Sequence, residues 1–312
     1  MLFDVVIPVR NGEKYINRAI KSALSQDNLG KIIVVDDGST DNTVKVILGA
    51  GYGSSVKLIS TPPRGLSLAR NAGIAQSDAL WIAFLDSDDY WGEGKLAVHL
   101  NHLEVHPDCY FSFTSAIDFS EETLGFKPQM KNSSGWGSFR SVIMQQFKIT
   151  GSASSVAISR EMLEKYHGFD ETLGYGEDWD LWIKLALEGK LCQIPEFLTF
   201  ICVREDSMQR TSKAGFKKFS NSEIHIYEVD KYSELISKSE ARALILNALW
   251  TDLRLEKNKS FFIFFPYLKY LACKYPALLE KVPFDRKLLI LILLLRTKVQ
   301  KKLARPGKIS HQ

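Results

Sequence analysis

Three carboxylates separated by one serine follow directly after a run of seven apolar residues. The apolar run is Ala79–Leu85, and the residues after it are Asp86, Ser87, Asp88 and Asp89. Successive side chains of an extended chain point to opposite sides, so Asp86 and Asp88 can face the same way. Carboxylates held this close repel each other unless a hard cation such as Mg²⁺ or Mn²⁺ shares them. The spacing predicts a divalent metal site, although Asp-x-Asp after a strand is also a common polar turn.

The elements that must position these side chains alternate between strand and helix patterns. We predict strands at 3–8, 31–36, 56–60 and 79–85, with helices at 13–25 and 66–76. Such alternation is typical of βαβ units and a parallel sheet. The second strand ends in Asp36 and Asp37, so two acidic clusters should lie at one edge of the sheet, where open α/β sheets bind ligands. A nucleotide-sized ligand could bridge the two clusters.

The remainder of the chain separates into two kinds of pattern. Up to about residue 215 we predict helices at 94–105, 160–166 and 178–188 and strands at 109–115, 152–159 and 191–203, with residues 118–150 unassigned. From about residue 216 strand patterns stop, and 222–236 and 239–256 have the spacing of amphipathic helices. We therefore predict an α/β domain over residues 1–215 and a helical C-terminal region over residues 216–312.

The C-terminal region differs from the rest of the chain in charge. Residues 251–312 carry a net charge of +10, whereas residues 1–250 carry −6, which together give the +4 of the whole chain. The apolar blocks Phe261–Leu268 and Leu288–Leu295 are flanked by lysine and arginine, which favours either a packed helical core or an anionic membrane surface. Neither block is long enough to cross a bilayer, which needs about 20 residues.

The four cysteines are Cys109, Cys192, Cys202 and Cys273, and no pair has CxxC spacing. In a chain of this length we expect free, buried thiols in a reducing compartment. No signal peptide is visible at the start of the chain. These observations predict a cytoplasmic protein, or one peripheral to the inner face of the cell membrane.

Several common sites are disfavoured by their missing motifs. The chain has no GxGxxG after the first strand and no GxxxxGK[ST], which argues against a dinucleotide cofactor or a P-loop. Any phosphate group of a ligand would then have to be bound by a metal ion and arginine side chains. His99, His102 and His106 fall on one helical face, but we expect no second metal site there, because oxygen ligands suit the expected cation better and Pro107 ends the helix.

Five segments together resemble the family 2 glycosyltransferases. In the family's order they are Val6–Glu13, Val34–Asp41, Gly65–Asn71, Asp86–Asp89 and Gly176–Trp179, spread over roughly residues 1–210. That family has a GT-A fold and uses nucleotide-diphosphate sugars. The resemblance implies a Rossmann-like, mixed but mainly parallel sheet flanked by helices, with the C-terminal helical region as an extension.

The resemblance also implies a role for each matching site residue. The nucleotide sugar would be bound by Pro8, Val9, Arg10, Asp37, Arg64, Asp86 and Ser87. Asp88 would be the main protein ligand of Mn²⁺ or Mg²⁺, and Asp178 would be the catalytic base. Arg70 and Asn71 are more often structural, so we leave them out of the site. Family members often carry a histidine beyond an arginine near 203–207, and this chain has none there.

The chemistry of the implied roles is that of direct displacement. A divalent cation neutralises charge on the departing nucleoside diphosphate, and a carboxylate that takes the acceptor's proton contributes about 10²–10⁴-fold. We expect an inverting transfer from a nucleotide-diphosphate sugar, by default a UDP-sugar, to a glycan or lipid-linked acceptor in surface polysaccharide biosynthesis. We expect no nucleic-acid partner.

Two other functions remain open from the sequence. A nucleotidyltransferase that makes sugar nucleotides would need a glycine-rich loop after the first strand, and Pro8–Gly12 is glycine-poor. A sugar-nucleotide-binding protein without turnover would have no need of Asp178, yet every acidic position is intact. Release of pyrophosphate would favour the first, and an Asp178→Asn variant with full transfer activity would refute the catalytic assignment of Asp178 and reopen the second.

Overall fold

The computed structural model describes residues 2–132, 134–174, 176–204, 221–241 and 243–245. The chain divides into two compact units, Met1–Lys218 and Phe219–Gln312. The predicted boundary between residues 215 and 216 lies outside the described residues.

The first unit alternates strands and helices as predicted for its first 90 residues. Its strands are β1 Phe3–Val9, β2 Leu29–Asp37, β3 Val56–Thr61, β4 Trp81–Phe84, β5 Tyr90–Trp91, β6 Cys109–Ser120, β7 Gly125–Pro128, β8 Trp136–Gly137, β9 Val156–Ser159 and β10 Lys190–Cys202. Its helices are α1 Ile16–Leu24, α2 Thr43–Gly49, α3 Leu66–Ile74, α4 Lys95–Val105, α5 Phe139–Ile143, α6 Arg160–Lys165 and α7 Glu177–Glu188. Two short 3₁₀ helices, η1 Gly53–Ser55 and η2 Ser152–Ser155, precede β3 and β9.

The strands form one mixed sheet in the order β3-β2-β1-β4-β9-β6-β10-β5, with β7 paired to β6 and β8 to β10. β1 runs parallel to both β2 and β4, and β2 runs parallel to β3. β9 is antiparallel to β4 and β6, and it joins this parallel half to the parallel pair β6 and β10. The predicted α/β fold with a mixed sheet flanked by helices is confirmed.

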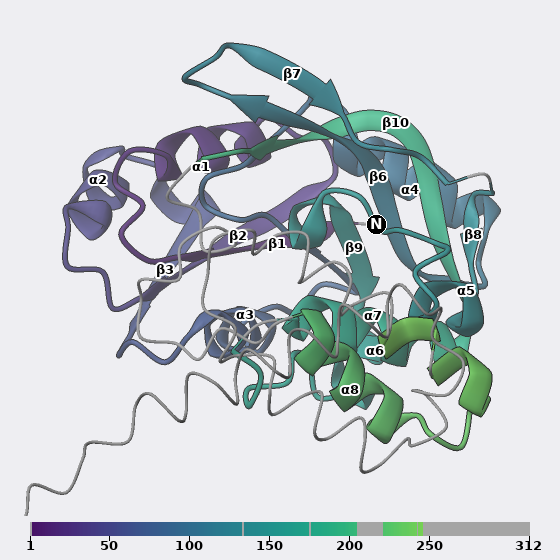
Figure 1. Ribbon diagram of the computed structural model, residues 1–312. Helices are drawn as coiled ribbons and strands as arrows, with labels where there is room; N and C mark the ends of the chain where they lie inside the picture. Colours follow the sequence, from purple (N-terminus) through teal and green to yellow (C-terminus); the bar gives the residue numbers. More distant parts are fainter. Residues whose placement is uncertain (1, 133, 175, 205–220, 242, 246–312) are drawn as a thin grey trace, which may run out of the picture. The chain divides into compact units, whose positions relative to one another are not determined.

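Helices cover both faces of the sheet (Figure 1). The apolar residues of α1 recur at helical spacing and enter one buried cluster with alternate residues of β1: Ile16, Ala19, Ile20, Ala23, Phe3, Val5, Ile7 and Val9. Val6 points to the opposite face, where a Cβ on Gly73 of α3 would lie 2.4 Å from its Cγ1. The strand period of two thus gives β1 one core with α1 and another with α3.

Aromatic side chains dominate the core on the α3 face. Phe169 lies edge-on to Phe84 of β4, with ring centroids 5.3 Å apart, and 6.2 Å from Trp182 of α7. Trp182 in turn contacts Phe111 of β6 at 4.7 Å. Full burial of such side chains stabilises the fold by roughly 1.5–3 kcal/mol each. These contacts hold α7 against β4 near the proposed site.

One predicted strand begins later than expected. Residues 152–159 were expected to be extended, but the first four form η2 and only Val156–Ser159 form β9. Gly151 before η2 has a φ of 77°, and Ser152 has a φ of 51°. A turn of serines therefore stands where the pattern predicted strand, and it presents hydroxyl groups to two acidic segments.

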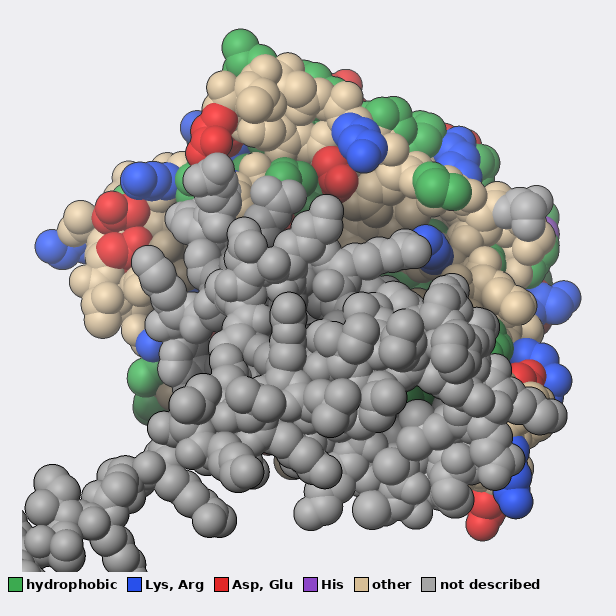
Figure 2. Space-filling view, in the orientation of Figure 1, with side chains coloured by type: hydrophobic (Ala, Val, Ile, Leu, Met, Phe, Trp, Pro, Cys, Tyr) green, Lys and Arg blue, Asp and Glu red, His purple; other side chains and the backbone are tan. Residues whose placement is uncertain are grey.

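The segment left unassigned by the sequence contains β7, β8 and α5. β7 forms a hairpin with the end of β6, and Leu124, Phe126 and Met130 in or beside it are exposed. Figure 2 shows hydrophobic side chains gathered over β7 at the top of the view. Turn residues at 121–124 and the absence of a clear period explain why this hairpin was not predicted.

In the second unit α8, Asn221–Lys231, overlaps the predicted helix 222–236 but ends five residues before it, and residues 238–241 and 243–245 are also helical. His225 and Glu228 pair on α8 at 3.0 Å, and both are buried. Most of the predicted helix 239–256 and both apolar blocks lie outside the described residues. None of the helices in the described part of the chain has the length and apolar character that crossing a bilayer requires.

The expectation of four free thiols was wrong for two of them. Cys109 and Cys192, which are 83 residues apart in the chain, are joined by a disulfide, while Cys202 is free and buried. The parallel pairing of β6 with β10 brings the first two together, and a strand pairing over this separation cannot be read from cysteine spacing. Cys273 lies outside the described residues.

Candidate functional site

Three parallel strands end at the same edge of the sheet and carry most of the predicted site. Val9 of β1 lies beside Asp36 of β2, and β4 flanks β1 on its other side. Strands are spaced about 4.8 Å apart, so the ends of β2 and β4 are separated by roughly 10 Å. Pro8 and Val9 are buried within β1, whereas Arg10 is exposed just beyond it.

The loop after β1 is held against the loop after β2 by hydrogen bonds. The backbone N–H of Asn11 donates to Ser39 Oγ (2.9 Å), and the Thr40 N–H donates to Asn11 Oδ1 (2.8 Å). A Cβ on Gly12 would lie 2.6 Å from Val9 Cγ2 and 3.4 Å from Ser87 Oγ, so only glycine fits without a shift. Ser87 therefore lies against the β1 loop, close to the predicted nucleotide contacts.

Asp37 holds the loop that leads into α3. Its carboxylate accepts hydrogen bonds from the backbone N–H groups of Arg64 (2.7 Å) and Gly65 (3.0 Å). Gly65 has a φ of 104°, which disfavours any residue with a side chain. The Arg64 side chain is exposed. Asp37 thus fixes the start of the helix that carries Arg70, with free lone pairs left on its oxygens.

Arg70 joins the two acidic segments and was not predicted as a site residue. Its guanidinium is 1% exposed and forms ion pairs with Asp86 and Glu177, each at 2.8 Å. Burial favours its neutral form, but the carboxylates of Asp86 and Glu177 outweigh burial and raise the pKa of Arg70. The Phe169 ring lies 5.0 Å from the guanidinium carbon and covers it. One buried cation therefore places the end of β4 against the first turn of α7.

The serines of η2 make a second bridge between the same segments. Ser152 Oγ donates to Asp178 Oδ2 (3.0 Å), and Ser154 Oγ accepts from the Asp86 N–H (3.0 Å). Asp178 also accepts from the N–H of Trp179 at 2.7 Å. A carboxylate in the first turn of a helix is favoured by the helix dipole. Asp86 and Asp178 thus belong to one hydrogen-bonded network, while Asp37 contacts neither of them directly.

Asp88 lies among cations. Its Oδ2 accepts from Arg204 Nη2 at 2.6 Å, and its backbone carbonyl accepts from Arg18 Nη2 at 2.5 Å. Burial and the nearby charge of Asp86 raise the pKa of Asp88, even though Arg204 opposes the shift. Arg204 lies in the segment near 203–207, in which members of the resembled family often carry a histidine. Its guanidinium gives this segment a direct contact with Asp88, the predicted metal ligand.

Asp89 is structural, unlike its two acidic neighbours. It is buried, and it accepts hydrogen bonds from Ser154 Oγ (2.5 Å) and from the backbone N–H of Cys202 (2.8 Å). Burial, with the charges of Asp88 and Asp86, raises its pKa well above the usual range. The third carboxylate of the motif therefore connects the β4 loop to the end of β10.

The donor set at this edge fits a hard divalent cation that also binds a substrate. The side chains of Asp86 and Asp88 are 26% and 24% exposed, so each has oxygen surface available. Mg²⁺ is commonly held by one or two carboxylates together with substrate phosphates. Among the described residues, the group of three side chains close enough to hold a metal by themselves lies elsewhere, at His102, Cys109 and Cys192. A metal at Asp86 and Asp88 would thus depend on the substrate for further ligands.

The structure brings together most, though not all, of the predicted residues. Asp86 and Asp178 share one network, Asp88, two residues beyond Asp86, pairs with Arg204, and Ser87 adjoins the β1 loop. Residues that the sequence reasoning left out complete it: Arg70, Ser152, Ser154, Glu177 and Arg204. The signal for two of them was available, because Arg70 and Glu177 both stand inside segments that carry the family resemblance. The two serines could not be identified from the sequence, because residues 152–159 were predicted to form a strand and not a helical turn.

A family model described as "Glycosyl transferase family 2" matches residues 4–167, about half of the chain. An uncharacterized glycosyltransferase from Rickettsia bellii is 30% identical over 224 residues, covering 72% of this chain and 31% of its own. The hyaluronan synthase of Pasteurella multocida is 26% identical, covering 79% of this chain and 26% of its own. The chain thus spans about a quarter to a third of the length of these relatives.

A solved structure with the same fold is TarS 1–349 of S. aureus in complex with UDP-GlcNAc. It has a TM-score of 0.62 and 20% sequence identity, over 80% of this chain and 72% of that one. The same protein in complex with UDP gives a TM-score of 0.59. At this identity the likeness supports the GT-A fold of the first unit.

Proposed function

The chain belongs to glycosyl transferase family 2, and from this premise we propose that it is a metal-dependent, inverting glycosyltransferase that uses a UDP-sugar. The observation that carries the proposal is the Arg70 guanidinium, which contacts Asp86 and Glu177 at 2.8 Å each. It places the proposed donor-binding carboxylates beside the helix turn that holds the proposed base.

The donor would lie along the edge formed by β2, β1 and β4. Asp37 would accept hydrogen bonds from the base, and Pro8, Val9 and Arg10 would border the nucleotide. Arg64 is exposed beside Asp37, so its charge is available to the diphosphate. TarS structures with UDP and UDP-GlcNAc support uridine as the base of the donor.

Asp178 would take the proton of the acceptor hydroxyl. Its Oδ2 accepts from Ser152, and its Oδ1 accepts from the Trp179 N–H, so the carboxylate is oriented by two donors. Each oxygen keeps a lone pair for the incoming hydroxyl. A single base opposite the leaving group gives direct displacement and inversion at the anomeric carbon.

Asp88, with Asp86, would hold Mn²⁺ or Mg²⁺. Such a cation, when bound, neutralises the charge that develops on the departing diphosphate. Arg70 forms an ion pair with Asp86 and holds it in place, while Arg204 lies against Asp88 and contributes positive charge to the same side.

The acceptor would be a hydroxyl of a glycan or of a lipid-linked sugar. Hyaluronan and chondroitin synthases of Pasteurella multocida are among the relatives, which supports a role in polysaccharide synthesis. The basic charge of residues 251–312 supports attachment to an anionic membrane surface at the inner face of the cell membrane. Co-sedimentation with anionic but not neutral vesicles, lost on deletion of residues 257–312, tests that attachment.

A thermal-shift panel tests the donor and the metal. Full-length protein is heated with UDP-, GDP- or dTDP-sugars, with and without Mn²⁺, and we expect stabilisation by UDP-sugars that grows with metal. Product analysis then separates the alternatives: UDP release supports transfer, whereas pyrophosphate release from a sugar phosphate and UTP would identify a nucleotidyltransferase. Stabilisation by UDP-sugar without any product, over a range of glycan acceptors, would contradict the catalytic proposal.

A further inference from the structure

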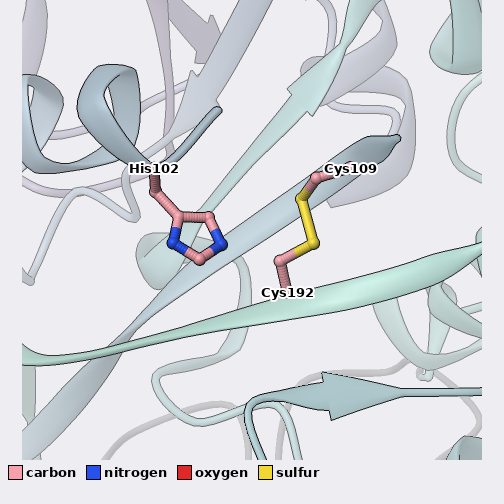
Figure 3. Close-up of side chains that lie close together, drawn as sticks. All are labelled: His102, Cys109 and Cys192. Carbon is pink, nitrogen blue, oxygen red and sulfur yellow. A yellow bond between two sulfur atoms is a disulfide. The ribbon is translucent and has the colours of Figure 1, made fainter. Parts of the chain in front are cut away.

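Two cysteines and a histidine meet at the end of the sheet opposite the acidic site. Cys109 begins β6, Cys192 is the third residue of β10, and His102 lies in the last turn of α4. The Cα atoms of the cysteines are 6.3 Å apart, and the two are joined by a disulfide. Figure 3 shows the His102 ring beside this pair. The pairing of β6 with β10 and the end of α4 thus bring together three side chains of types that commonly bind metals.

The donor atoms of this cluster are close enough to share one ion. The two sulfur atoms and an imidazole nitrogen all lie within 4.8 Å of one another. Thiolate sulfur and imidazole nitrogen are the ligands of Zn²⁺, at about 2.3 Å and 2.0–2.1 Å from the metal. Ligands at those bond lengths stand roughly 3.5–3.8 Å from each other in a tetrahedral site. Small side-chain movements therefore suffice once the sulfur atoms are no longer bonded.

His102 supplies a second, independent observation. Its Nε2 is buried and has no hydrogen-bond partner among the described residues. A buried polar atom without a partner is costly, and it calls for an explanation such as an ion. A disulfide between Cys109 and Cys192 needs no imidazole beside it, so the disulfide alone does not account for this nitrogen.

The surroundings bury both sulfur atoms and cover the imidazole with an aromatic ring. Both cysteines are almost fully buried, and Trp136 of β8 pairs with Cys192 and packs against the His102 and His106 rings. Three protein ligands with a water in the fourth position make up a common zinc arrangement. The ten residues from Cys192 to Cys202 span about 30 Å of strand, so this cluster is separate from the acidic site.

We propose that Cys109, Cys192 and His102 form a Zn²⁺ site in the reduced protein, and that metal and disulfide are alternative states of the same pair. Two molecules of a thiol reductant convert the disulfide into two cysteine thiols and become one oxidised disulfide themselves. Zn²⁺ then binds both sulfur atoms, and the two thiol protons pass to solvent. Either state ties the start of β6 to the start of β10, and the metal adds the end of α4.

The test measures metal binding by full-length protein in two redox states. Metal-free protein is reduced, handled without oxygen and titrated with Zn²⁺ against a chromophoric chelator, and with Co²⁺ for its spectrum. We expect one ion per chain and a thiolate-to-cobalt charge-transfer band in the near ultraviolet. The oxidised protein has the same sequence, and we expect it to lack both signals.

Variants assign the ligands. We expect Cys109→Ser and Cys192→Ser to lose stoichiometric binding, and His102→Ala, at a half-buried position in the last turn of α4, to lose it without disturbing the core. The matched controls Cys202→Ser and Cys273→Ser should keep the full signal. A reduced wild-type protein that binds no Zn²⁺, or a His102→Ala variant that binds with unchanged affinity, would overturn the proposal.

Discussion

The carboxylates at the end of β4 and the cysteine pair at the start of β6 are two chemically opposite regions of one sheet. The first gathers half-buried oxygen ligands around a buried arginine, and the second gathers buried sulfur and nitrogen with no charged side chain among its three members. Hard ligands with open surface suit a cation that arrives with a substrate, whereas soft, enclosed ligands suit a resident ion or a disulfide. The difference teaches that the proposed catalytic site and a structural link can occupy opposite ends of the same sheet.

The two regions also differ in how far the sequence predicts them. Asp86 and Asp88 follow a seven-residue apolar run, so local period and spacing suffice to find them. Asp178 needed the family resemblance, because a lone acidic residue at a helix start is usually a cap. Cys109 and Cys192 are 83 residues apart, and their contact depends on which strands pair, which no local pattern specifies. The information that local sequence patterns do not contain is therefore which strands become neighbours in the sheet.

The largest expected effect tests whether the acidic region is the catalytic one of the two, and it is the loss of turnover on substitution of Asp178. Asp178→Asn keeps the shape and an acceptor for Ser152 but cannot take a proton, so kcat should fall by about 10²–10⁴-fold. The measurement is UDP release from the donor in the presence of acceptor. Glu161→Gln, an exposed acid in the first turn of α6, is the matched control and should retain wild-type kcat. Unchanged turnover in Asp178→Asn would move the base elsewhere.

The next largest effect concerns the stability of the acidic region. Arg70→Met leaves Asp86 and Glu177 without their buried cation, so the free energy of unfolding should fall by about 3–5 kcal/mol. Arg160→Met removes an exposed ion pair to Glu164 and should cost less than about 1 kcal/mol. Urea unfolding without metal or donor measures both. Equal losses in the two variants would show that Arg70 is no more than a surface cation.

The disulfide provides the matching stability measurement at the other end of the sheet. In metal-free protein, reduction of the bond between Cys109 and Cys192 should lower the free energy of unfolding by about 2–4 kcal/mol, since it closes a long loop in the unfolded chain. UDP-sugar affinity, measured by calorimetry, should stay the same. A weaker donor affinity after reduction would mean that the two regions are coupled.

The smallest expected effect sharpens the metal assignment. Asp88→Asn removes a charged oxygen ligand, so the Mn²⁺ concentration for half-maximal stabilisation should rise at least about tenfold. Asp78→Asn, an exposed acid just before β4, should leave that concentration unchanged. Zn²⁺ binding by the reduced protein should be the same in both variants. A shift of equal size in Asp78→Asn would point to general surface charge instead.

The buried guanidinium of Arg70 also constrains how this protein can diverge. It is 16 positions from Asp86 and 107 from Glu177, yet it contacts both. Loss of Arg70 leaves both acids without their shared counter-charge, and loss of either acid removes one of the two ion pairs of the buried guanidinium, so single substitutions should be purged during descent. Among distant relatives we expect these three positions to be retained together or replaced together, a covariation that spans about half of the α/β unit.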